Sequence, residues 1–157
     1  MNLFADAADG AAPLEHVRVE LELRFPSDVR YIERVVELVR LQCHELRYPP
    51  HHCSLNVPVA LTEALSNAIL RGNGEDRTKT VSVRAEVDPA RLVLEVADEG
   101  IGFDLEKMMV DPTLPENLDR EDGRGLFLMR SLMDLVERFD RNGIGEGNVV
   151  RLVLHRG

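Results

Sequence analysis

The feature that most constrains the fold of this chain is the order of its hydrophobic patterns. The alternation typical of a strand comes first, and the spacing typical of an amphipathic helix follows it. Every second residue from Val17 to Phe25 is apolar, which predicts a strand with one buried face. Helical spacing then follows twice, over residues 27–46 and over about residues 56–70, so two amphipathic helices come after the strand. We expect Ser27 to cap the first of these helices and a Pro-Pro pair to end it.

A hairpin, a long loop and a third helix complete the pattern. Alternation returns at residues 81–87 and 92–96, and an acidic stretch with two prolines at about residues 105–122 predicts a long loop. A helix then opens at Gly123, and the segments "LVERFD" and "VVRLVLH" predict two more strands. This order predicts an α/β sandwich in which helices cover one face of a mostly antiparallel, mixed sheet.

Composition narrows the class of protein. The net charge of −9 and an aromatic content of 4% without Trp argue against nucleic-acid binding. The first residues lack the pattern of a secretory signal, and no stretch approaches the roughly 20 apolar residues of a membrane span. Two cysteines make no disulfide framework, so we expect a cytoplasmic protein without a membrane anchor. Residues 1–14 are expected to be a flexible N-terminal tail, and residues 15–157 a single domain.

Two polar residues on the second predicted helix are candidates for chemistry. Glu63 and Asn67, in the segment "EALSNA", are four residues apart and therefore project from the same side of the helix. A carboxylate can serve as a general base, and an amide oxygen is a suitable ligand for Mg²⁺. An ordinary polar helix face has the same pattern, so the pair does not decide between the two interpretations alone.

The segment "VADEGIGFD" ends a predicted strand with an acid and two glycines. Asp98 could accept a hydrogen bond from the amino group of a ligand, while Gly100 and Gly102 would allow close approach of the backbone. A strand-ending turn is the other interpretation. Further along, "GRGL" opens the third helix at Gly123, and the free N–H groups of such a helix start can bind an anion.

Taken in order, these motifs resemble a known ATP-binding domain. A helix with Asn67, a strand ending in Asp-x-Gly-x-Gly, a long loop and a Gly-x-Gly-Leu helix start are shared by gyrase B, heat-shock chaperones, sensor histidine kinases and mismatch-repair ATPases. Their domain has the Bergerat fold. A closer resemblance, over about residues 17–155, is to the stand-alone serine kinases that act as bacterial anti-sigma factors.

The resemblance implies a role for each candidate residue. Asn67 would ligate Mg²⁺, Asp98 would bind the adenine amino group, and Glu63 would take the proton of the attacking hydroxyl. The loop at about residues 105–122 would be the ATP lid. The remaining positions expected to contact ATP are the glycines beside the base and the start of the third helix, namely Gly100, Gly102, Gly123, Arg124, Gly125 and Leu126.

Two positions depart from the commoner pattern of these domains. Arg71 stands where a His often precedes the glycine that ends the Asn-bearing helix. Asn148 stands near the place where a Thr often opens the last strand and helps to hold the adenine. The first change leaves the expected Mg²⁺ ligand in place, and the second alters one expected adenine contact.

The function implied is that of an ATP-dependent protein serine/threonine kinase. It would phosphorylate an antagonist, an anti-anti-sigma (STAS-like) protein, and regulate a sigma factor by partner switching, with a homodimer as one expected assembly. The alternative is a non-catalytic, nucleotide-gated binding module that sequesters a protein partner. Glu63 favours the kinase, because binding alone does not need a carboxylate one turn from the Mg²⁺ ligand.

The segment "CHELRYPPHHC" offers two further interpretations, and we expect neither to apply. His44 resembles the phospho-acceptor of sensor histidine kinases, but prolines end its helix and the Glu63 helix follows almost at once, which leaves no room for the acceptor hairpin. The cysteines and histidines are zinc ligands by type, but their spacing is not that of a zinc finger. They are Cys43, His44, His51, His52 and Cys53.

Overall fold

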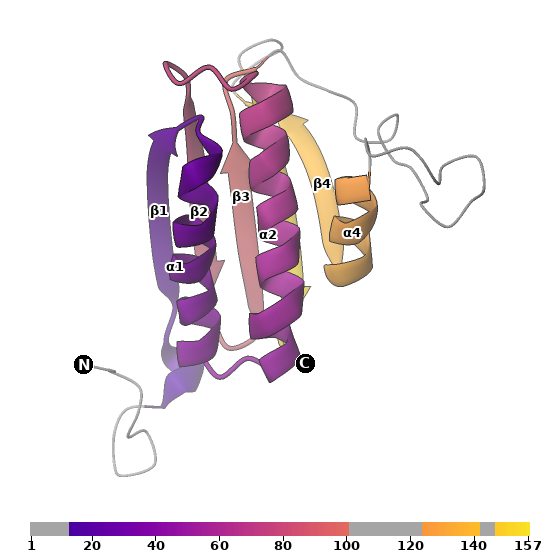
Figure 1. Ribbon diagram of the computed structural model, residues 1–157. Coiled ribbons are helices and arrows are strands. Elements are labelled where there is room, and N and C mark those ends of the chain that lie inside the picture. Colours follow the sequence, from indigo (N-terminus) through magenta and orange to yellow (C-terminus); the bar gives the residue numbers. More distant parts are fainter. Residues whose placement is uncertain (1–12, 101–123, 142–146) are drawn as a thin grey trace, which may run out of the picture.

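The computed structural model describes residues 13–100, 124–141 and 147–157. These residues form a sheet of five strands in the order β1-β2-β3-β5-β4, and each neighbouring pair is antiparallel. Helices cover one face of the sheet (Figure 1), which confirms the predicted α/β sandwich. The strands are β1 (Val19–Pro26), β2 (Thr80–Val87), β3 (Arg91–Ala97), β4 (Leu135–Asp140) and β5 (Asn148–His155).

The strand register explains the alternation in the sequence. Leu23 lies opposite Val83, Val83 opposite Val96, and Val96 opposite Val150. These apolar residues therefore form a row across four strands, and the row faces the helices. Side chains alternate between the two faces of a strand, so the charged residues between them lie on the other face.

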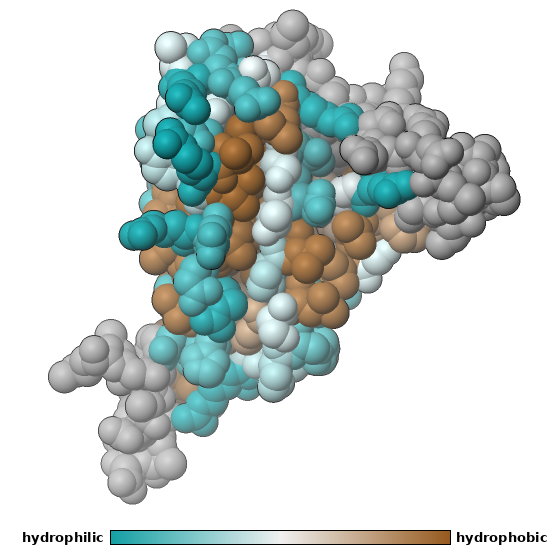
Figure 2. All heavy atoms as spheres, in the orientation of Figure 1, coloured by the Kyte–Doolittle hydropathy of each residue, from teal (hydrophilic) through white to brown (hydrophobic). Residues whose placement is uncertain are grey.

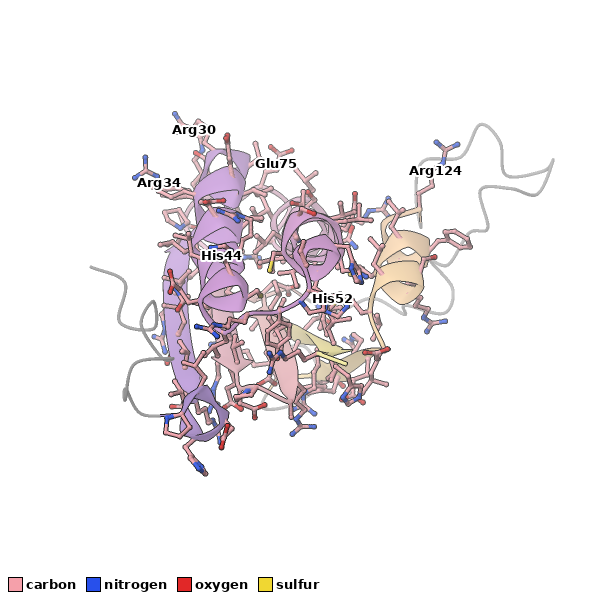
Figure 3. All side chains as sticks on the ribbon, turned by 90° about the horizontal axis from the view of Figure 1, so that it is seen from below. Arg30, Arg34, His44, His52, Glu75 and Arg124 are labelled. Atoms are coloured by element: carbon pink, nitrogen blue, oxygen red, sulfur yellow. The ribbon has the colours of Figure 1, made fainter. Side chains whose placement is uncertain are left out.

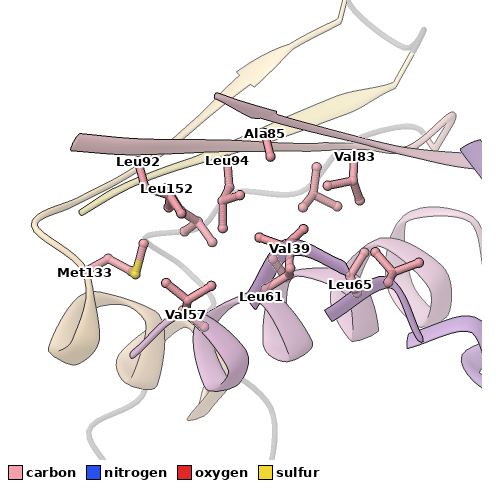
Figure 4. Close-up of a cluster of buried hydrophobic side chains, with 14 of the residues drawn as sticks. Val39, Val57, Leu61, Leu65, Val83, Ala85, Leu92, Leu94, Met133 and Leu152 are labelled. Atoms are coloured by element: carbon pink, nitrogen blue, oxygen red, sulfur yellow. The ribbon is translucent and has the colours of Figure 1, made fainter. Parts of the chain in front are cut away.

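Within the described residues, three α-helices form the second layer. They are α1 (Ile32–Glu45), α2 (Val57–Ser66) and α4 (Arg124–Leu132). The core fills the space between these helices and the sheet, where Val39, Leu61, Leu65, Leu94 and Leu152 are fully buried (Figure 4).

The entry to α1 differs from the prediction that Ser27 caps it. Ser27 instead donates its hydroxyl to the carbonyl of Lys79, 2.8 Å away. Asp28 is the capping residue, because its carboxylate accepts the backbone N–H of Arg30 at 2.9 Å in the short 3-10 turn that leads into α1. The Arg30 guanidinium pairs with the same carboxylate, and these hydrogen bonds lower the pKa of Asp28 to about 2.

The helical stretch around α2 is long and apolar. It runs from His52 to Gly72, with π-helical turns at His52–Asn56 and Asn67–Gly72, and could cross a membrane by length and composition alone. The central helix of a globular core passes the same test. Here Val57 and Leu61 are fully buried in the core, so we interpret this stretch as the core helix.

The start of the chain was predicted to be a separate tail. Residues 1–12 lie outside the described residues, while Leu14 begins a short 3-10 helix, Leu14–His16, and packs against the core. The division into a tail at 1–14 and a domain at 15–157 stays a prediction.

Candidate functional site

Asp98 is held at the end of β3 by a dense set of hydrogen bonds. Its Oδ1 accepts the backbone N–H of Gly100 at 2.8 Å, and both the backbone and side-chain N–H groups of Asn148 at 3.3 and 3.2 Å. Asp98 is 2% exposed, and no described residue donates to its Oδ2. The carboxylate is therefore fixed in orientation with one oxygen left as an acceptor.

Two glycines allow backbone to pass unusually close to this carboxylate. A Cβ atom on Gly72 would lie 2.2 Å from Asp98 Oδ2, and a Cβ on Gly100 would lie 1.8 Å from the carbonyl oxygen of Gly72. Any side chain at either position would collide with the site. Gly100 was predicted from the sequence, whereas Gly72 was not, because its neighbour in space comes from a strand that follows much later.

Asn73 is a buried residue of the site that sequence reasoning missed. Its Oδ1 accepts the backbone N–H of Glu99 at 2.7 Å, and its Nδ2 donates to Ser27 Oγ at 2.8 Å and to the Thr80 carbonyl at 3.2 Å. The side chain thus joins the end of the α2 stretch to the residue after β1, to β2 and to the residue after Asp98. In the sequence it lies in a polar loop, where a buried asparagine looks like an exposed one.

Glu63 projects from α2 beside the start of α4, and Asn67 follows one helical turn later, directly after α2. Both are half-buried, and Asn67 begins the π-helical turn that ends the stretch. A Cβ on Gly125 would lie 2.6 Å from Glu63 Oε2, so the first turn of α4 packs directly on this carboxylate. Burial raises the pKa of Glu63 above its ordinary value of 4.5. The structure therefore brings Glu63 and Gly125 together, although they are 62 positions apart in the sequence.

The other predicted residues of this region have mixed placements. Arg124 is the first residue of α4. The Leu126 side chain is 1% exposed and belongs to the core, so only its backbone could face a ligand. Gly102, Gly123 and the predicted lid at about residues 105–122 lie outside the described residues.

The unusual Asn148 connects Asp98 to a half-buried arginine. Asn148 opens β5, is fully buried, and accepts a hydrogen bond at Oδ1 from Arg138 on β4. Arg138 also pairs with Asp140 at 2.8 Å. Arg138 was not predicted, because nothing in the pattern of β4 separates it from a solvated arginine. Arg71, the other departure, is exposed.

The cysteine- and histidine-rich segment is divided between the core and the surface. Cys43 is fully buried, and burial, together with the neighbouring Cys53, raises the pKa of its thiol to about 12. His44 is exposed on α1, while His52 lies at the start of the α2 stretch (Figure 3). No group of three His, Cys, Asp or Glu side chains within the described ranges could hold a metal ion.

Comparison with known proteins agrees with this geometry. A model of the histidine kinase-like ATPase domain matches residues 25–154, so the fold and site define a domain of that class. The serine-protein kinase RsbW of Bacillus subtilis is 37% identical over 94 residues, covering 57% of this chain and 59% of that protein. RsbW of Bacillus velezensis is 30% identical over 129 residues, covering 79% and 80%. The anti-sigma F factor of Clostridium acetobutylicum is 33% identical over 91 residues, covering 57% and 63%.

The chain belongs to the anti-sigma serine kinase family within the histidine kinase-like ATPases, which confirms the predicted relationship. It spans less than two thirds of the Bacillus subtilis and Clostridium acetobutylicum relatives and four fifths of the Bacillus velezensis protein.

Solved structures support the same fold. The RsbU and RsbW domains of a Mycobacterium tuberculosis protein match with a TM-score of 0.61 at 14% identity, over 87% of this chain and 32% of that one. The mycobacterial sensor histidine kinase MprB matches with a TM-score of 0.51 at 17% identity, over 88% and 97%. At such low identity the likeness concerns the fold alone.

Proposed function

We propose that this chain is an ATP-dependent protein serine/threonine kinase of the anti-sigma type. The observation that carries the proposal is the position of Glu63. Its carboxylate is half-buried, its pKa is raised by burial, and it lies against the first turn of α4 and one helical turn before Asn67. A half-buried carboxylate with a raised pKa is better suited to act as a general base than to a purely structural role.

The adenine end of the proposed ATP site is formed around Asp98. Its Oδ2 can accept one N–H of an adenine amino group, because Oδ1 is already occupied by three donors. The close approach of Gly72 and Gly100 leaves backbone rather than side chains beside that oxygen. The adenine ring would therefore be recognised by a carboxylate oxygen that is buried and fixed in orientation.

The phosphate end would lie between α2 and α4. The start of α4 at Arg124 and Gly125 offers backbone N–H groups and the positive end of the helix dipole. Asn67 can be the one protein ligand of Mg²⁺, because this ion usually fills most of its other coordination positions with water and phosphate oxygens. When bound, Mg²⁺ would neutralise charge on the phosphates. We propose that Gly102 completes the adenine end of the ATP site and that Gly123 completes the phosphate end.

In the transfer itself Glu63 would act on the protein substrate. It accepts the proton from a Ser or Thr hydroxyl as that oxygen attacks the terminal phosphorus, and ADP leaves. Half-burial matters here, because a carboxylate with a raised pKa is a stronger base than an exposed one. The rest of the catalysis is positioning by α2 and α4.

The proposed protein partners are an antagonist that receives the phosphate and a sigma factor that is held or released by partner switching. Support comes from the relatives, one of which is named as an anti-sigma F factor. The helix layer also exposes large apolar side chains, including Leu38, Leu41 and Leu70, among charged ones (Figure 2). A surface of this kind suits protein binding. The homodimer and the cytoplasmic location stay predictions.

Labelled ATP and the cognate antagonist test the proposal. Glu63→Gln should reduce phosphate transfer by about 100-fold or more, while ATP affinity stays within about threefold. The matched control is Glu33→Gln, which alters an exposed glutamate on α1 and should transfer at the wild-type rate. Transfer by Glu63→Gln at the rate of the control would show that Glu63 is not the base. If the unaltered chain binds ATP but phosphorylates no antagonist, the chain is the non-catalytic binding module instead.

A further inference from the structure

Asn148 holds Asp98 through both its backbone and its side chain. It opens β5 and is fully buried. Its side-chain Nδ2 donates to Asp98 Oδ1 at 3.2 Å, and its backbone carbonyl accepts the N–H of Asp98 at 2.9 Å. These contacts leave the side-chain oxygen of Asn148 as a buried acceptor that needs a donor from another residue.

Arg138, on the neighbouring strand β4, supplies the donor for the side-chain oxygen of Asn148. It lies opposite Val150, which belongs to the core. Paired residues of antiparallel strands point to the same face, so the Arg138 side chain lies on the helix-covered face of the sheet. Its guanidinium donates to Asn148 Oδ1 and pairs with Asp140 at 2.8 Å. A buried acceptor without a partner costs free energy, and Arg138 removes that cost.

The amide of Asn148 has one orientation that suits both of its neighbours. An arginine side chain has only donors, and a carboxylate oxygen only accepts, so the amide turns its oxygen to Arg138 and its NH₂ group to Asp98. We propose that Arg138 is a positioning residue for the adenine end of the ATP site. By holding Asn148, it keeps Asp98 turned so that Oδ2 faces the amino group of the base.

The contacts that position Asp98 extend to the edge of the sheet. In the order β1-β2-β3-β5-β4, β4 is an edge strand. Asp140, the last residue of β4, is exposed and holds Arg138, whereas Asp98 is buried beyond the end of β3. A partly exposed ion pair on β4 thus positions a buried acceptor two strands away. This role rests on the proposed function, because it concerns the same ATP site.

The preference for ATP over inosine triphosphate measures this role. Inosine triphosphate has a carbonyl oxygen in place of the amino group, so the ratio of the two affinities depends on how Asp98 presents Oδ2. Arg138→Met keeps an unbranched side chain but cannot donate, and should reduce this ratio at least about threefold by calorimetry. Asn148→Ala should also reduce the ratio. Adding Arg138→Met to Asn148→Ala should change it no further, because the connection is already cut.

Arg151→Met is the matched control. Arg151 on β5 forms ion pairs with Glu95 and Glu137. It follows the buried Val150, so its side chain lies on the face of the sheet that the helices leave uncovered. The control should therefore lose these ion pairs without a change in the ratio of the two affinities. Arg138→Thr introduces a residue that strands favour, and this second replacement should give the same ratio as Arg138→Met.

These variants separate positioning from other roles of Arg138. Equal losses of affinity for both nucleotides in Arg138→Met would overturn the proposal, because Arg138 would then support the sheet as a whole. A further reduction of the ratio in the chain that already carries Asn148→Ala would also overturn it, because Arg138 would then act on the base directly. An unaltered chain that binds neither nucleotide would refute the proposed function together with this role. ATP binding with an unchanged ratio in Arg138→Met would refute this role alone.

Discussion

Replacing Asp98 with asparagine isolates the proposed contact with adenine. Three N–H donors meet at Oδ1, two from Asn148 and one from Gly100. An introduced amide must therefore place its oxygen there, because its NH₂ group would meet three donors in that position. The NH₂ then takes the place of Oδ2 and turns an acceptor into a donor, with no change in shape beside Gly72.

The size of the effect follows from the type of bond. A hydrogen bond to a charged group contributes about 1.5–3 kcal/mol. Its loss corresponds to ATP binding that is about 10- to 150-fold weaker. Inosine triphosphate carries a carbonyl oxygen where ATP carries the amino group, so it should bind the Asp98→Asn variant at least as well as it binds the unaltered chain. Thermal stability should change little, since the hydrogen bonds to Oδ1 remain.

Isothermal titration with the two nucleotides measures this change. The unaltered chain should prefer ATP, and in the variant the preference should shrink or reverse. A variant that loses affinity for both nucleotides equally would show that Asp98 acts on the pocket as a whole rather than on the amino group. Unchanged affinity for ATP would remove Asp98 from the site.

Three further outcomes are expected. The rate of phosphate transfer should rise with pH as Glu63 loses its proton, and burial places the midpoint of this rise above pH 4.5. Initial rates measured in a series of buffers test this, and a midpoint at or below pH 4.5 would contradict it. Gly100→Ala puts a Cβ 1.8 Å from the Gly72 carbonyl, so calorimetry should show ATP affinity reduced by about tenfold or more. Leu61→Ala empties a fully buried position, and urea unfolding should show a loss of about 2–5 kcal/mol, whereas a loss below about 1 kcal/mol would mean that the core refills the space.

Much of the fold could be predicted from the sequence because its hydrophobic periods are clear. The alternation at residues 81–87 and 92–96 corresponds to β2 and β3, and the predicted third helix begins within one residue of α4. The cap of α1 was misplaced by one residue, from Asp28 to Ser27. Both side chains are good caps, and only the tertiary contact of Ser27 with Lys79 decides between them.

The candidate site was less predictable wherever a role depends on distant neighbours. Glu63 and Asp98 could be singled out because short motifs surround them. Gly72 and Asn73 could not, since each acts through a segment remote in the chain. Arg138 could not either, because the pattern of β4 does not separate it from a solvated arginine. The π-helical turns at both ends of α2 were also missed, because an extra residue in a helical turn leaves little trace in a periodic pattern.

The position of β5 in the sheet has a consequence for when, during synthesis, the proposed adenine contact can form. It is the last described strand along the chain, yet it lies between β3 and β4. Asp98 depends on Asn148, 50 residues later, for two of its donors. Synthesis proceeds from the N-terminus, so the ribosome releases Glu63, Asn67 and Asp98 well before the strand that fixes the carboxylate. A nascent chain can therefore form its helices and first hairpin early, but the proposed adenine contact must wait until β5 inserts.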